Sequence, residues 1–163
     1  MDHWFEGVIA WLSLPQYGLA TLFLVALVSA TLLPLGSEPA LFGLVKLNPQ
    51  LFWWAILVAT LGNTLGGAIS WATGYGAERA YEGLVHKPPP GPASARALAW
   101  LERHGAAACL LSWLPIVGDP LCAVAGWLRL PFWPCVGYMA IGKLARYVAM
   151  TSAMLWIWPH AAP

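Results

Sequence analysis

Two short phrases each place a carboxylate between prolines inside apolar sequence. The carboxylates belong to Glu38 and Asp119, which are separated by about half the length of the chain. A charge that interrupts a hydrophobic stretch is costly and therefore predicts a functional site. A repeated pair of such interruptions indicates an internally duplicated membrane protein with a site near its middle. The flanking prolines, which we expect to break helices and form hairpins, are Pro34, Pro39, Pro115 and Pro120.

Two cations lie near the centre of the last apolar stretch. Lys143 and Arg146 are three residues apart, so they share a face of the helix predicted for residues 132–158. A cation at the centre of a membrane-spanning helix costs about 2.5–3.5 kcal/mol, so both residues need partners. Glu38 and Asp119 are the acids inside apolar sequence, and they would make the set neutral. The sequence therefore predicts a four-charge centre.

Two interpretations of this centre remain open. The charges could form salt bridges that only hold two broken hairpins together. Alternatively, they could line a polar cavity that binds an anionic headgroup or exchanges protons. Arg129 and Asn63 are further candidate headgroup contacts, although Arg129 could equally be a topology anchor beside Pro131.

The sequence gives no support for hydrolytic, nucleotide-binding or metal-dependent chemistry. The sequence contains no HExxH, P-loop or GxSxG motif and no set of residues with metal-ligand spacing. Ser37 and Ser112 have no nearby histidine that could act as a base. We therefore predict no catalytic residue, no metal, no cofactor and no enzymatic activity. The net charge of +1 gives no reason to expect a nucleic-acid partner.

The composition indicates an integral membrane protein. The chain has 163 residues, of which 60% are hydrophobic and only 9% charged. Its mean hydropathy is +0.66, and soluble domains carry roughly 25% charged residues. We predict an all-α protein in which residues 1–163 form a single membrane domain.

The expected elements follow from the proline breaks and the apolar runs. Residues 76–104 hold half of the lysines and arginines, and the positive-inside rule predicts that this linker is cytoplasmic. A first repeat is expected over 18–75 and a second over 105–158. The remaining expectations are an amphipathic helix over 2–14, a hairpin near 33–47, a span over 51–75 and a second hairpin near 105–130.

Correspondences outside the acid phrases support the duplication. Gly62 and Gly142 lie at almost the same offset as the two acids, as do Pro49 and Pro131. Gly62 and Gly66 stand one helical turn apart, which permits close helix approach and a homodimer.

The combined pattern resembles the DedA family of membrane proteins, also called the SNARE-associated or VTT-domain family, and in particular its small YqaA-like branch. The resemblance covers roughly residues 18–150. It rests on Gly36-Ser37-Glu38-Pro39, Gly62-Asn63-Thr64-Leu65-Gly66, Gly74-Tyr75-Gly76, Leu114-Pro115-Ile116-Val117-Gly118-Asp119-Pro120, Gly142-Lys143 and Arg146-Tyr147.

This resemblance implies an inverted-repeat bundle with two re-entrant helical hairpins in the bacterial inner membrane. It also implies that the protein moves lipids between leaflets, with undecaprenyl phosphate or phosphatidylethanolamine as substrates of bacterial members and dependence on the proton-motive force. Glu38 and Asp119 take the family's hairpin acid positions. Better-known members carry arginines around the second hairpin's proline, but Pro115 has none nearby. We therefore expect Lys143 and Arg146 to supply that charge.

The leading hypothesis is a multi-pass lipid flippase or scramblase that moves a phosphate-bearing lipid, either a phospholipid or a polyprenyl phosphate, with proton coupling as an open variant. One alternative is a non-transporting membrane scaffold whose buried charges are structural. Another is a transporter of ions or small solutes.

Overall fold

The computed structural model describes residues 15–30, 37–82, 103–114 and 118–157, and within these ranges the chain is helical and contains no strand. The expected amphipathic helix over 2–14 lies outside the described residues, as do Pro34, Pro115 and most of the expected linker.

The longest element is helix α4, Phe52–Glu82, which the short 3₁₀ turn η1, Pro49–Leu51, precedes. Within the described part of the chain, residues 49–80 form the single helix that is long and apolar enough to cross a membrane. The helix continues beyond the predicted end at Tyr75, into the segment expected to be linker. Residues 77–80 are Ala-Glu-Arg-Ala, which are strong helix formers, and Glu78 is buried there.

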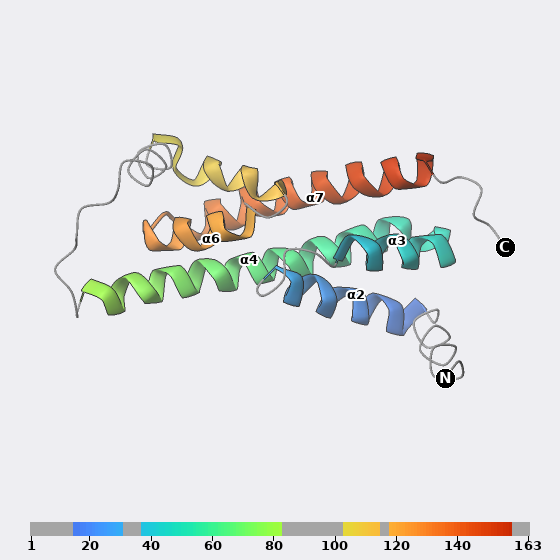
Figure 1. Cartoon of the computed structure of the whole chain (residues 1–163), viewed down its shortest axis with the longest axis horizontal. Helices are drawn as coiled ribbons and strands as arrows, with labels where there is room; N and C mark the ends of the chain where they lie inside the picture. Colours follow the sequence, from blue (N-terminus) through green and yellow to red (C-terminus); the bar gives the residue numbers. More distant parts are fainter. Residues whose placement is uncertain (1–14, 31–36, 83–102, 115–117, 158–163) are drawn as a thin grey trace.

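Helix α7, Phe132–Ile157, lies along α4 and runs in the opposite direction (Figure 1). Its bounds agree within one residue with the span predicted over 132–158. Pro134 is its third residue, where a missing backbone N–H costs no hydrogen bond. Together α4 and α7 form the frame on which the shorter helices pack.

Helices α2, Pro15–Ser29, and α3, Ser37–Leu47, pack against the half of α4 that is nearer its N-terminus (Figure 1). Gly62 and Gly66 of α4 face α2. A Cβ on Gly62 would stand 2.5 Å from the carbonyl oxygen of Phe23, and one on Gly66 would stand 2.5 Å from the Cβ of Ala30. The small-residue face therefore serves packing inside the chain, and the homodimer stays a prediction.

Helix α6, Gly118–Trp127, packs against the other half of α4, and the 3₁₀ helix η2, Gly105–Trp113, packs on α7 and α6 (Figure 1). Two glycines allow the close approach of α4 and α6. A Cβ on Gly74 would overlap the backbone carbonyl of Ala123, and one on Gly126 would overlap that of Trp71.

Pro39 and Pro120 lie at the starts of helices, and their role in forming hairpins stays a prediction. Each is the third residue of a helix, α3 and α6 respectively, and each follows the acid of its phrase. Proline is well tolerated in the first turn, because backbone N–H groups there have no intrahelical acceptor. Gly43, also expected to interrupt the chain, lies inside α3.

The core consists of two apolar clusters at opposite ends of the α4–α7 pair. One cluster, between α2, α3, α4 and α7, comprises Leu22, Ala26, Leu41, Leu44, Val45, Ala55, Ile56, Ala59 and Tyr147. The other, between η2, α6 and α7, comprises Cys109, Cys122, Ala125, Cys135 and Met139. Helix α7 contributes Cys135 and Met139 to the second cluster and Tyr147 to the first cluster. Lys143 lies between them, so a polar layer separates the clusters.

Candidate functional site

Lys143 is the most deeply buried charge among the described residues, with 1% of its surface exposed. Its ammonium donates to the backbone carbonyl oxygen of Asn63 at 2.7 Å and to the side-chain carbonyl oxygen of the same residue. It also donates to Oδ1 of Asp119 at 2.9 Å. An ammonium has three N–H donors, so this arrangement satisfies all of them.

Gly67 makes room for this ammonium. A Cβ on Gly67 would stand 3.2 Å from Nζ of Lys143 and 3.3 Å from the sulfur of Met139. Glycine at this position therefore allows α7 to bring its cation against the backbone of α4.

A hydrogen-bonded chain leads from Lys143 into the first cluster. The side-chain amide of Asn63 donates to the hydroxyl of Tyr147 at 2.9 Å, and that hydroxyl donates to Oγ of Ser37 at 2.8 Å. Asn63 and Ser37 are buried. A polar group in such a position is costly unless it is hydrogen-bonded, and these three are bonded to one another.

Arg146 and Glu38 form the second ion pair, between NH2 of the guanidinium and Oε1 of the carboxylate. About a tenth of each side chain is exposed. The Nε of Arg146 is buried and has no hydrogen-bond partner among the described residues. Because a guanidinium carries five N–H donors, this side chain retains capacity for a further acceptor.

The two acids occupy equivalent positions in their helices. Glu38 is the second residue of α3 and Asp119 the second residue of α6. A negative charge in the first turn is favoured by the helix dipole and by backbone N–H groups that lack intrahelical acceptors. The acid-proline phrases therefore start helices whose N-termini face the cations of α7.

The four residues predicted to form the centre thus meet in two pairs, and Asn63 bridges toward the second pair through Tyr147 and Ser37. Sequence reasoning left open which acid pairs with which cation. Their role in binding a substrate or protons stays a prediction.

Sequence reasoning missed Tyr147 as part of the centre, although a signal was present. Tyr147 lies four residues after Lys143, so the two share a face of α7. Ser37 was considered only as a nucleophile, yet it lies beside Glu38 at the start of α3.

Arg129 takes part in a different arrangement. Its Nε donates to Oε2 of Glu78 at 2.7 Å, near the C-terminal end of α4. Arg129 has a φ of 54°. Its backbone N–H donates to the carbonyl oxygen of Gly126, and the backbone N–H of Leu130 donates to the carbonyl oxygen of Ala125. These bonds form a Schellman motif that ends α6, with Arg129 in the left-handed position usually taken by glycine. Its role as a headgroup contact stays a prediction.

No group of three or more His, Cys, Asp or Glu residues that could hold a metal ion occurs in the described ranges. The fold and the site define an all-helical protein in which Glu38, Asp119, Lys143 and Arg146 turn inward and pair with one another, the arrangement that charges within membrane helices require. The family model described as VTT domain matches residues 33–155. The chain belongs to this VTT-domain family, which is also called the DedA family.

Individual relatives agree with this assignment. Inner membrane protein YqaA of Escherichia coli (strain K12) is 37% identical to this chain over 142 residues, covering 85% of this chain and 94% of that protein. The protein of the same name from Shigella flexneri has the same identity and coverage. An uncharacterized protein of Haemophilus influenzae is 38% identical over 141 residues, covering 81% of this chain and 84% of that protein. No solved structure matches this chain.

Proposed function

We propose that this protein is a lipid transporter of the bacterial inner membrane, a flippase or scramblase that moves a phosphate-bearing lipid between leaflets. The single observation that carries the proposal is the buried pair of acid-cation contacts at the middle of the helical bundle. Membership of the VTT-domain family and the name of the inner membrane relatives support the location.

Exposed apolar side chains also support a membrane environment. Large hydrophobic residues on the outside of the long helices include Leu57, Leu61, Leu65, Ile69 and Ile141. Contiguous apolar surface of this kind is unfavourable in water and favourable against lipid. We further propose a multi-pass, inverted-repeat topology, in which α2–α3 and η2–α6 act as re-entrant hairpins that enter from opposite sides.

In the proposed mechanism an anionic headgroup competes with an acid for its cation. A phosphate would accept hydrogen bonds from Arg146, which already has a buried N–H without a described partner. The displaced Glu38 would then be a buried carboxylate without its cation. Uptake of a proton by that carboxylate would keep the centre neutral, which gives lipid movement a route to proton coupling.

The test is lipid translocation in proteoliposomes that contain a fluorescent phosphatidylglycerol. Wild type is compared with Asp119→Asn and Lys143→Ala. The elution profile of each protein in detergent is the control for folding. We expect both folded variants to lose most of the translocation. Unchanged translocation in both would refute the proposed site. An imposed pH gradient that does not alter the wild-type rate would refute proton coupling alone.

A second candidate function is a non-transporting scaffold, and the complete set of acceptors around Lys143 favours it. The double variant Asp119→Leu with Lys143→Met separates the two candidates. Replacing a buried ion pair by apolar residues is often neutral for stability. A scaffold would therefore keep its folding and its role in cells, whereas a transporter would stay folded and lose translocation.

A further inference from the structure

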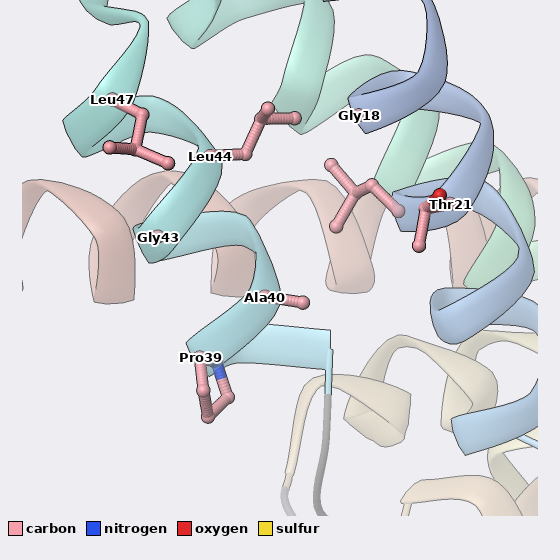
Figure 2. Close-up of a pocket in the computed structure, with 8 residues that line it drawn as sticks. Gly18, Thr21, Pro39, Ala40, Gly43, Leu44 and Leu47 are labelled. Carbon is pink, nitrogen blue, oxygen red and sulfur yellow. The ribbon is translucent and has the colours of Figure 1, made fainter. Parts of the chain in front are cut away.

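A groove lies between α2 and α3, and Pro39, one of its lining residues, is the chain neighbour of Glu38. The groove has a volume of about 250 Å³ and is almost entirely apolar. Figure 2 shows Pro39, Ala40, Gly43, Leu44 and Leu47 along one face of α3, opposite Gly18 and Thr21 of α2. Pro39 is the residue next to Glu38, so the groove ends one residue along α3 from the acid that pairs with Arg146.

We propose that this groove holds one acyl chain of a lipid whose phosphate reaches Arg146. The proposal rests on the proposed function and deepens it, because it assigns separate places to the two ends of the lipid. Three observations on the described residues carry it, namely the shape of the groove, the space beside Gly43 and the donor on Arg146.

The shape of the groove fits a single hydrocarbon chain. Residues 39 and 47 of α3 are eight apart, so the groove extends for ~12 Å along the helix. One leaflet of the hydrocarbon core is about 15 Å thick, half of the ~30 Å bilayer core. About 250 Å³ spread over that length leaves a channel only a few ångström wide. A helix, which with its side chains is ~10–12 Å across, cannot enter it.

Gly43 lines the groove without adding a side chain to it. A Cβ on Gly43 would have no atom within 4 Å, although the residue lies in the middle of α3. The floor is formed by Leu22 and Leu44, which are buried, while Leu47 at the outer end is 56% exposed. The groove is thus open to the surroundings at one end.

The cation that pairs with Glu38, the chain neighbour of Pro39, favours an occupant with an anionic head. Arg146 forms one ion pair with Glu38, and its buried Nε has no hydrogen-bond partner among the described residues. An apolar chain in the groove and a phosphate at Arg146 would match the chemistry of both ends. A purely hydrophobic peptide would leave that donor without an acceptor.

The experiment uses the full chain in vesicles of phosphatidylethanolamine and phosphatidylglycerol. The probe is a phosphatidylglycerol that carries a diazirine on one acyl chain, and mass spectrometry locates the labelled residues after illumination. The test variant is Gly43→Leu, which fills the groove. The matched control is Gly76→Leu, because Gly76 is also a helical glycine with no atom within 4 Å of its Cβ position and it lies on α4, outside the groove.

We expect labelling of the groove-lining face of α2 and α3 in the wild type. Gly43→Leu should reduce that labelling at least about fourfold, since each methylene excluded from an apolar site weakens binding by about that factor. Gly76→Leu should leave it unchanged. Equal labelling of the groove in the two variants, or labelling spread evenly over all lipid-facing residues, would overturn the proposal.

The phosphate contact is tested with the same probe and a diazirine diacylglycerol that lacks phosphate. Arg146→Gln should reduce groove labelling by the phosphatidylglycerol probe and not by the diacylglycerol. An equal effect on both probes would overturn the assignment of the headgroup. A Gly43→Cys variant tests whether the chain's own N-terminal segment occupies the groove. Cross-links from this cysteine to residues 1–14, together with no lipid labelling, would overturn the proposal.

These outcomes are distinguishable from failure of the proposed function. A wild type whose groove is labelled but which translocates no lipid would refute the transporter and leave a lipid-binding groove. A wild type that translocates lipid with an unlabelled groove would refute the groove alone.

Discussion

The ammonium of Lys143 receives all of its hydrogen-bond acceptors from two residues of other helices, Asn63 on α4 and Asp119 on α6. At the scale of single residues, Asn63 is the connection in this centre, because its side chain accepts from Lys143 and donates to Tyr147. Neutral side chains therefore lead from the Lys143–Asp119 pair to Ser37, the chain neighbour of Glu38.

This arrangement predicts different effects for two neighbouring buried residues. Asn63→Leu removes an acceptor from a buried charge and should lower the free energy of unfolding by roughly 2–3 kcal/mol. Thr64→Val is the control, because the Thr64 hydroxyl is buried without a partner among the described residues and its loss should cost little. Denaturation by sodium dodecyl sulfate in mixed micelles measures both. A Thr64→Val variant as destabilised as Asn63→Leu would contradict the assignment.

The bond between Tyr147 and Ser37 gives a second prediction at this scale. Tyr147→Phe and Ser37→Ala should each lower the free energy of unfolding by about 1 kcal/mol. Because the two hydroxyls bond to each other at 2.8 Å, the double variant should cost less than the sum, with a coupling of roughly 0.5–1 kcal/mol. A double-mutant cycle of unfolding measurements decides this. Strictly additive losses would show that the two hydroxyls do not interact in the folded protein.

At the scale of elements, the close approach of α4 and α6 depends on the absence of a side chain at Gly74. Gly74→Ala would push a methyl group into the backbone of Ala123 and should destabilise the protein by roughly 1–3 kcal/mol. Gly76→Ala, on the same helix but with open space at its Cβ position, should be neutral or stabilising by up to about 1 kcal/mol. Thermal unfolding of the two variants compares them directly, and equal melting temperatures would contradict the packing described for α4 and α6.

The end of α6 offers another prediction at the element scale. Arg129 occupies a left-handed position, which costs a residue with a side chain about 1–2 kcal/mol relative to glycine. Arg129→Gly and Arg129→Ala both lose the bond to Glu78, so their difference isolates the backbone. We expect Arg129→Gly to unfold at the higher temperature of the two. The opposite order would argue against the Schellman ending of α6.

At the scale of the whole molecule, α4 and α7 run in opposite directions, so the start of one lies at the same end of the molecule as the end of the other (Figure 1). Exposed tryptophans mark these ends, with Trp53 at the start of α4 and Trp156 at the end of α7. Trp133 marks the opposite end, at the start of α7. Indole rings at such positions are typical of the boundary between lipid and water.

The proposed membrane topology therefore predicts an accessibility pattern for single cysteines. Trp53→Cys and Trp156→Cys should react with a membrane-impermeant maleimide from the same side, and Trp133→Cys from the other. By the positive-inside rule, we expect position 133 to be cytoplasmic. The native Cys109, Cys122 and Cys135 are fully buried, which keeps the background low. Labelling of all three variants from one side would contradict a bundle that crosses the membrane.

The sequence alone predicted the local features well. Long apolar runs predicted α4 and α7, because a run of that length in a membrane must satisfy its backbone hydrogen bonds within the segment. The cost of a charge among apolar residues predicted that Glu38, Asp119, Lys143 and Arg146 would need one another. These inferences rest on composition and spacing along a single stretch of chain, which are properties that a sequence displays directly.

Only the tertiary structure decided the features that depend on contacts between distant segments. It paired Glu38 with Arg146 and Asp119 with Lys143, although either acid could have neutralised either cation. It placed Pro39 and Pro120 in first turns, where they start helices, and it covered the Gly62 face with α2. The groove beside Gly43 likewise exists only because residues of α2 and α3, which are distant in sequence, line one space. Pairing, coverage and hollow space depend on how helices meet, and the spacing of residues along one helix does not specify which other helix will lie against it.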